Sequence, residues 1–159
     1  MKGGRAAVVV LGAAAAAMLL VMVAPAAVQR MQDRMDHTAR YPSGAAAKAD
    51  RGGQAPGWLP DSATGVALLG SDRQGDRLIR ATLPERALPA ACTAGGPLGS
   101  VRLRAPWFPA DTPQRATAHC GLYDVALVGD QLYGWQDAAV VAADRGAGRA
   151  ADRSAGPVD

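Results

Sequence analysis

The sequence is poor in the residues that most enzymes use for catalysis. Of its two histidines, only His119 lies in the part of the chain that holds the tryptophans, and no Gly-x-Ser-x-Gly motif is present. A serine hydrolase needs a serine, a general base and an orienting acid within hydrogen-bond reach. The glycine-rich stretch at 95–99 lacks the Lys-Ser/Thr ending of a phosphate-binding loop. We therefore expect no catalysis and no cofactor.

Lysine is also scarce, and the positive charge is confined to one end. The chain has a formal charge of +3 and contains 2 lysines and 15 arginines, a bias that we attribute to genomic base composition. Residues 1–57 hold seven basic and three acidic residues, whereas residues 58–141 hold seven arginines and eight acidic residues. A domain that binds nucleic acid needs a basic surface. The charge pattern therefore predicts no nucleic-acid partner.

The chain does contain a long apolar run near its N-terminus. Lys2 and Arg5 precede residues 6–28, a stretch of 23 residues without charge. As a helix it spans about 34 Å, against about 30 Å for the hydrocarbon core of a bilayer. Positive residues stay on the cytoplasmic side, so the chain from Gln29 onward lies outside. Residues 1–28 are predicted to be the transmembrane anchor of a single-pass cell-membrane protein with an extracytoplasmic C-terminal domain.

A cleaved signal peptide is the alternative for the same segment. Small residues flank Pro25, and cleavage near Ala26 or Ala27 would release a secreted protein. The apolar run is longer than the roughly 7–15 residues of a typical signal core. Arg30 and Arg34 follow it closely, as basic residues do at the end of an uncleaved anchor. These features favour the membrane anchor.

The composition of the rest of the chain predicts four segments: a helix, a linker, a folded domain and a tail. Apolar residues at helical spacing predict a juxtamembrane helix over 29–40. Residues 41–57 have no apolar residue larger than alanine after the tyrosine that begins them, so we expect a linker. Residues 142–159 are equally poor in large apolar residues and predict a disordered tail, with a helix near 138–143 as the alternative at its start. Between them, residues 58–141 hold all three tryptophans, the single phenylalanine and both cysteines, and form the predicted extracytoplasmic domain.

Alternating patterns within 58–141 predict short strands. One hairpin is expected from 66–70 and 78–83 around a polar connection. A second is expected from 122–128 and 131–135, because the glycine that opens the Gly-Asp turn between them supplies the positive φ of a type II′ turn.

Two further elements complete the predicted domain. Residues 100–104 alternate apolar side chains with arginines, which predicts a strand with one buried face. A short helix fits between Pro84 and Pro89. The predicted fold class is α+β or mostly β, with about five strands in a small domain stapled by a disulfide.

The two cysteines, Cys92 and Cys120, both lie in the predicted extracytoplasmic domain. An even number of cysteines in an oxidising compartment predicts a disulfide. Closing a loop of about 29 residues stabilises a fold by roughly 3.5 kcal/mol in the chain-entropy model. A redox pair is the alternative, although the Cys-x-x-Cys spacing is absent. A zinc site around His119 lacks a ligand unless Asp111 or Asp124 joins it, so we predict no metal.

The remaining candidates are aromatic. Trp58 begins the domain, and Tyr133 and Trp135 end it on one strand face that suits the core. Trp107 and Phe108 lie between two prolines in a loop, where two adjacent bulky residues do not easily both point inward. Packing in the core is the first explanation for these two residues, and exposure of one of them to a partner, which makes them the candidate binding loop, is the second.

Four short motifs carry a resemblance to a known group. They are Trp58-Leu59-Pro60-Asp61, the mid-domain Cys92, Cys120-Gly121 and the closing Tyr133-Gly134-Trp135. With them, about residues 58–137 resemble short actinobacterial membrane-anchored or secreted proteins of unknown function. The resemblance implies a location in the cell envelope and a disulfide, but no activity. The Gly-Gly-Pro-Leu-Gly loop after Cys92 departs from the pattern of that group.

These observations together favour one function. We expect the small extracytoplasmic domain to act as a non-catalytic binding module for an envelope protein or glycan, with the membrane holding its anchor. A structural accessory subunit that joins a membrane complex through the anchor helix is the alternative, and a hydrolase with an unrecognised active site is a third. The oligomeric state does not follow from the sequence.

The predicted topology can be tested with a reporter. A phosphatase that is active only outside the cytoplasm should be active when fused after Asp159, because Lys2 and Arg5 hold the N-terminus inside. The fusion should also remain with the membranes after a carbonate wash. An inactive phosphatase would contradict the orientation, and release into the medium with a new N-terminus near Ala27 would favour the cleaved signal.

Overall fold

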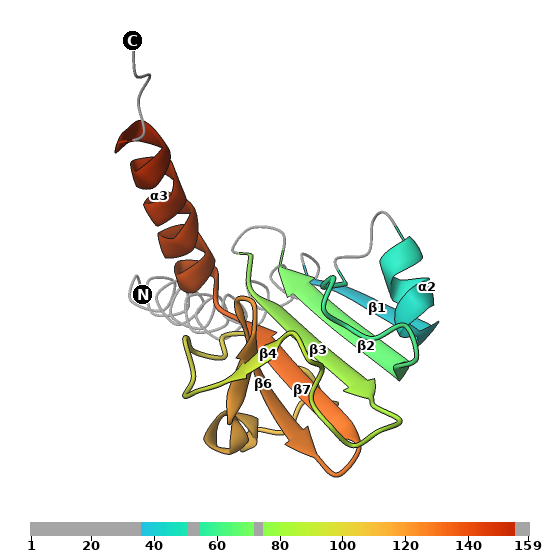
Figure 1. Ribbon diagram of the computed structural model, residues 1–159. Helices are drawn as coiled ribbons and strands as arrows, with labels where there is room; N and C mark the ends of the chain where they lie inside the picture. The colour runs from blue at the N-terminus through green and yellow to red at the C-terminus, as the bar shows by residue number, and fades with distance from the viewer. Residues whose placement is uncertain (1–35, 51–54, 72–74, 155–159) are drawn as a thin grey trace, which may run out of the picture. The chain divides into compact units, whose positions relative to one another are not determined.

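The computed structural model describes residues 36–50, 55–71 and 75–154 (Figure 1). They form one antiparallel sheet of seven strands in the order β1-β2-β3-β7-β6-β5-β4. The strands are β1 (Asp36–Ser43), β2 (Thr64–Ser71), β3 (Arg77–Thr82), β4 (Cys92–Ala94), β5 (Ala118–Cys120), β6 (Tyr123–Val128) and β7 (Gln131–Gln136). The helices are α2 (Gly44–Ala49), the short 3₁₀ helix η1 (Thr112–Arg115) and α3 (Ala138–Ser154). The mostly β prediction is confirmed, with more strands than the five expected.

The predicted anchor at 1–28 lies outside the described residues, as does the first part of the predicted juxtamembrane helix. Among the residues that the structure describes, none of the helices is long and apolar enough to cross a membrane.

Both predicted hairpins are confirmed. Strand β2 pairs antiparallel with β3, and β6 pairs with β7 so that Val128 lies opposite Gln131. Gly129 begins the two-residue turn with φ of +67°, the left-handed conformation that a type II′ turn requires at this position. The backbone N–H of Leu83 donates to the carbonyl oxygen of Asp130 at 2.7 Å, which ties the end of β3 to this turn.

The sheet buries a separate apolar cluster on each face. The larger cluster contains Val66, Ile79, Val125 and Leu132, all at most 1% exposed. At its centre, a Cβ added to Gly134 would lie 2.8 Å from Cγ2 of Ile79, so the glycine provides the space that this isoleucine fills. The smaller cluster, on the other face, contains Leu69, Leu78 and Trp135. Alternation along the strands produces this division, since successive side chains point to opposite faces.

The predictions for residues 36–57 are wrong where the structure describes them. Residues 36–40 are not helical, because they pair with β2 along the sheet edge as part of β1. The predicted linker contains the end of β1 and the helix α2, which the Ser43 hydroxyl caps by accepting from the N–H of Ala46 at 3.1 Å. The folded domain therefore begins at Asp36 rather than at Trp58.

Small residues make the contact between α2 and the domain possible. A Cβ on Gly44 would lie 1.9 Å from the carbonyl oxygen of Pro60, so only glycine fits there. The Gly44 N–H donates to the carbonyl oxygen of Ala63 at 2.8 Å, and Ala47 is fully buried in the larger cluster. An ion pair between Lys48 and Asp61 lies beside this contact. Close backbone approach replaces large side chains in this part of the core.

Two other sequence predictions are also wrong. The predicted disordered tail is helical as far as Ser154, as the second part of α3, which extends away from the sheet (Figure 1). In its first turn Val141 is 8% exposed, and the next residues, 142–145, are exposed. The segment between Pro84 and Pro89 forms turns rather than a helix, and Arg86 there has φ of +48°.

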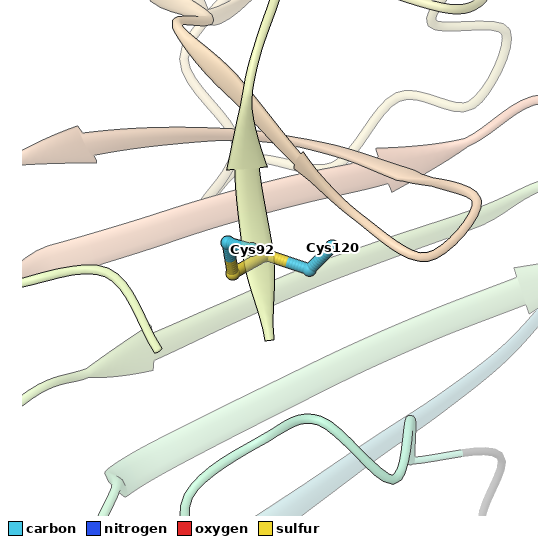
Figure 2. Close-up of a disulfide and its surroundings, with 2 residues drawn as sticks. All are labelled: Cys92 and Cys120. Carbon is cyan, nitrogen blue, oxygen red and sulfur yellow. A yellow bond between two sulfur atoms is a disulfide. The ribbon is translucent and has the colours of Figure 1, made fainter. Parts of the chain in front are cut away.

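The predicted disulfide is confirmed. Cys92 and Cys120 lie directly opposite each other on β4 and β5, with 4.1 Å between their Cα atoms (Figure 2). Cys120 is fully buried in the larger cluster, whereas Cys92 is half-buried on the three-residue edge strand β4. So short a strand contributes few ladder hydrogen bonds, and the disulfide therefore holds this edge of the sheet covalently.

We expect the double variant Cys92→Ala, Cys120→Ala to lower the free energy of unfolding by about 3 kcal/mol, because the unfolded chain loses its cross-link. Urea denaturation of the purified protein measures this change. A reductant should lower the midpoint of the original chain and leave that of the variant unchanged. Thiol labelling of the denatured chain without reductant, or equal midpoints for the two proteins, would contradict the structural role.

Candidate functional site

The smaller apolar cluster is covered by the irregular segment 98–108. Its side chains Val101, Leu103 and Ala105 pack against Leu69, Leu78 and Trp135. The strand predicted over 100–104 is wrong, because these residues have no ladder partner in the sheet. The predicted alternation is nevertheless present, since the intervening arginines are exposed. We call residues 98–108 the covering segment.

Asp124 holds the beginning of the covering segment on the sheet. It is 1% exposed, and its two carboxylate oxygens accept from the N–H of Leu98 at 2.7 Å and from that of Gly99 at 3.0 Å. The indole N–H of Trp135 donates to the carbonyl oxygen of Gly99 at 3.2 Å. Hydrogen bonds to a charged acceptor contribute about 1.5–3 kcal/mol each. This carboxylate is therefore structural.

Asp137 joins the covering segment to α3. It accepts from the N–H of Ser100 at 2.9 Å and, as the helix cap, from the N–H of Ala139 at 2.8 Å. Its carboxylate also lies 3.4 Å from Nε of Arg102. The Ser100 hydrogen bond is the main reason why the pKa of Asp137 is below its usual value, with smaller contributions from Ala139 and Arg102 acting against the effect of burial.

A third buried aspartate completes the capping of α3. Asp76 is 1% exposed, and its Oδ1 accepts from the N–H of Ala138 at 2.8 Å. Two carboxylates thus receive the first two N–H groups of the helix, where negative charge is stabilised by the helix dipole. The covering segment, the sheet and α3 are connected through these buried acids.

The candidate binding loop, Trp107 and Phe108, lies at the end of the covering segment. The Phe108 ring makes edge contacts with Tyr133 and Trp135, with centroids 5.8 and 6.4 Å apart, and a third with Trp107 at 6.1 Å. Both loop residues are half-buried. Both rings pack against the smaller cluster: Phe108 contacts two rings of the sheet, whereas Trp107 has Phe108 as its one aromatic neighbour among the described residues.

Trp107 also contacts a cation. The guanidinium carbon of Arg80 lies 5.8 Å from the centroid of its ring, within the range of a cation–π interaction. Arg80 lies opposite Ala67 on β2, which in turn lies opposite Arg40 on β1. Residues directly opposite each other share a face, and strands are about 4.8 Å apart, so the two arginines are about 10 Å apart at the backbone.

Tyr133 extends the same row, because it lies opposite Arg80 on β7. We call Arg40, Arg80, Trp107 and Tyr133 the arginine–aromatic patch. Arg40 is exposed and the other three are half-buried. Neither arginine forms an ion pair with another residue in the described part of the chain. The patch therefore presents two uncompensated positive charges beside two aromatic rings.

Among the residues that the structure describes, His119 has no set of ligands around it that would make a zinc site. It lies opposite Asp124 on β6, whose oxygens already accept from backbone N–H groups. Both cysteine sulfurs are in the disulfide, and the described residues include no group of three His, Cys, Asp or Glu side chains that could hold a metal ion. Asp111, the other ligand considered, forms an ion pair with Arg115.

Sequence reasoning missed the two arginines of the patch and the structural role of the buried aspartates. Asp137 had a local signal, because an aspartate directly before an alanine-rich run is typical of a helix N-cap. Arg40 and Arg80 had none, since they are 40 residues apart in the sequence and share a face only through their common neighbour Ala67 on β2.

Neither a scan against protein-family models nor searches of the curated proteins and of the solved structures finds a match for this chain. The resemblance to short actinobacterial envelope proteins therefore stays a prediction, and the function has to be argued from the residues described above.

The low pKa of Asp137 predicts a pH-dependent stability. A carboxylate with a depressed pKa in the folded state stabilises above its unfolded pKa, near 3.8, and this stabilisation is lost as the pH falls through the folded value. The variant Asp137→Asn should thus be about 2 kcal/mol less stable at neutral pH. The difference between the two proteins should shrink as the pH falls below about 4.

Denaturant titrations at several pH values measure this difference. Asp111→Asn is the matched control, because that aspartate forms an exposed ion pair, and its effect should stay below about 1 kcal/mol at every pH. A constant difference between Asp137→Asn and the original protein from pH 7 to pH 3 would show that the carboxylate charge is not what holds Ser100.

Proposed function

We propose that this chain is a single-pass cell-envelope protein whose extracytoplasmic domain is a non-catalytic binding module. The contact surface is the arginine–aromatic patch, which includes Trp107 of the candidate binding loop. The apolar run at 6–28 supports the envelope location, because it is long enough to cross a bilayer and follows basic residues. The disulfide is in keeping with an oxidising compartment.

The observation that carries the binding role is the position of Trp107. Its ring is only half-buried, although the sheet beneath offers a continuous apolar cluster, and it lies between Phe108 and the guanidinium of Arg80. Tryptophan, tyrosine and arginine are the residues most enriched where binding energy is concentrated. Fixing Trp107 between prolines and stacked partners reduces the conformational entropy that it would lose on binding.

The burial and the hydrogen bonds of the carboxylates support a non-catalytic function. A general acid or base must be within reach of a substrate. Asp124 and Asp137 are instead at most 5% exposed and accept from backbone N–H groups. The His119 ring lies against Gly95, where an added Cβ would be 2.9 Å from its Cε1. The two carboxylates are therefore occupied in holding the fold, whereas the buried Nδ1 of His119 has no hydrogen-bond partner among the described residues.

Photo-crosslinking in the cell tests the proposed surface. A benzophenone amino acid placed at the exposed Arg104, three residues before Trp107, should form an adduct when irradiated, because the partner covers the patch. The same amino acid at the exposed Glu85, in the turns after β3, should form none. Mass spectrometry of the adduct identifies it as protein, glycan or lipid.

Two tryptophan variants make the result specific. With the crosslinker at position 104, Trp107→Ala should abolish the adduct. Trp58→Ala, which removes a half-buried ring that packs on Tyr123 in the other cluster, should preserve it. An adduct that survives Trp107→Ala would contradict the patch as the contact surface, and turnover of an envelope substrate lost on His119→Ala would contradict the non-catalytic role.

A further inference from the structure

We propose that the arginine–aromatic patch binds the anionic lipid surface of the membrane in which this chain is anchored. The inference deepens the proposed function and rests on it, since it requires the apolar run at 6–28 to be an anchor. Three observations lead to the lipid: the length of chain available as a tether, the charge of the patch and the types of residue that make it.

The tether is short. Strand β1 begins at Asp36, and the apolar run ends at Val28, so only residues 29–35 separate them. Seven residues reach at most about 25 Å even when fully extended. The stretch 41–57, which would have lengthened the tether as a linker, instead contributes to β1 and α2. The lipid surface is consequently within reach of the domain throughout the life of the protein.

The patch lies close to this tether in the sequence and in the sheet. Arg40 is on the edge strand β1, the first element after the tether, and Arg80 is two strands further in. A tethered surface meets its partner at a high effective concentration, so contacts that would be too weak between separate molecules are sufficient. Two arginines and two rings are a contact of this modest size.

The residue types match the headgroup layer of a bilayer. Tryptophan and tyrosine concentrate there, with the ring in apolar surroundings and the polar atom in contact with water. Arginine near an anionic leaflet is attracted by its surface potential, which decays within a Debye length. Arg104, which is exposed three residues before Trp107 on the covering segment, adds one more cation close to the patch in the sequence.

Acidic groups on this side of the sheet do not cancel that attraction at the patch. Asp124 lies in the neighbouring row of residues, opposite Trp135, and Asp137 lies beyond the end of β7. Both are buried and accept hydrogen bonds from backbone N–H groups. Asp137 also pairs with Arg102. Asp111, which is exposed, is paired with Arg115. Within the described part of the chain, Arg40 and Arg80 form no ion pair that would offset their charge.

Fluorescence quenching on the full chain tests the proposal. The chain is reconstituted in nanodiscs of brominated phosphatidylcholine, either alone or with about 30% phosphatidylglycerol. The chain has three tryptophans: Trp135 is fully buried, and Trp58 packs in the opposite cluster. Bromine should quench Trp107 about twofold more strongly in the anionic discs, and about 0.5 M NaCl should remove the difference. Trp107→Phe should lose this component of the quenching.

Variants of the two arginines separate charge from packing. Arg40→Gln with Arg80→Gln should abolish the lipid-dependent difference, whereas Arg40→Lys with Arg80→Lys should keep most of it. The control is Arg145→Gln, on the exposed part of α3, which should change nothing. Melting temperatures of all variants check that the domain is folded. Equal quenching in the two kinds of disc, or a difference that survives the double glutamine variant, would overturn the lipid contact.

The outcomes distinguish this inference from the function on which it rests. If quenching is the same in both discs while the crosslinker at position 104 still forms a Trp107-dependent adduct with a protein or glycan, the binding surface stands and the lipid contact is wrong. If a carbonate wash releases the chain from membranes, the anchor is wrong and the lipid contact is wrong with it.

Discussion

The arrangement of the candidate site depends on the carboxylate of Asp124. It lies on the sheet face that carries the smaller apolar cluster, and it is the point at which an irregular chain of eleven residues begins to follow that face. Without a charged acceptor there, the N–H groups of Leu98 and Gly99 would be buried without partners, at a cost of about 1–3 kcal/mol each. Water would replace the segment, Trp135 would lose its cover, and Trp107 would have no fixed position beside Arg80.

The sequence was most informative where structure is decided locally. The Gly129 turn and the alternation on either side of it predicted the β6–β7 hairpin, and the even number of cysteines predicted the disulfide. The segment from Asp36 to Asp50 was predicted wrongly, because large apolar residues were taken as the sign of a core. Gly44 and Ala47 are buried by close backbone contact, which side-chain size cannot indicate. The structure has seven strands instead of five because β1, β4 and β5 were not predicted, whereas the strand predicted over 100–104 is absent from these described residues.

The candidate site was predictable only in part, because most of its residues are brought together by strand pairing rather than by a local pattern. The Trp107-Phe108 pair is conspicuous in the sequence because it lies between prolines, and it does lie at one edge of the patch. Its companions come from β1, β3 and β7, which the order of the strands brings together and which no local pattern connects. The exposed residues of the covering segment were correctly separated from the buried ones by their alternation, although the strand inferred from that alternation does not exist. Amphipathic periodicity records which side chains are buried, not whether the backbone has a ladder partner.

The two edges of the sheet are protected by different means. At one edge, Pro42 interrupts the eight residues of β1 with a position that has no N–H to offer to another strand. At the other, β4 has three residues and remains beside β5 through a covalent bond between its first residue and Cys120. In a cytoplasm that keeps thiols reduced, this second edge loses its clamp, and β5 becomes a site where a newly made copy can add its own strand. Oxidation of the two cysteines therefore guards this edge against pairing with another copy, and reducing conditions expose it.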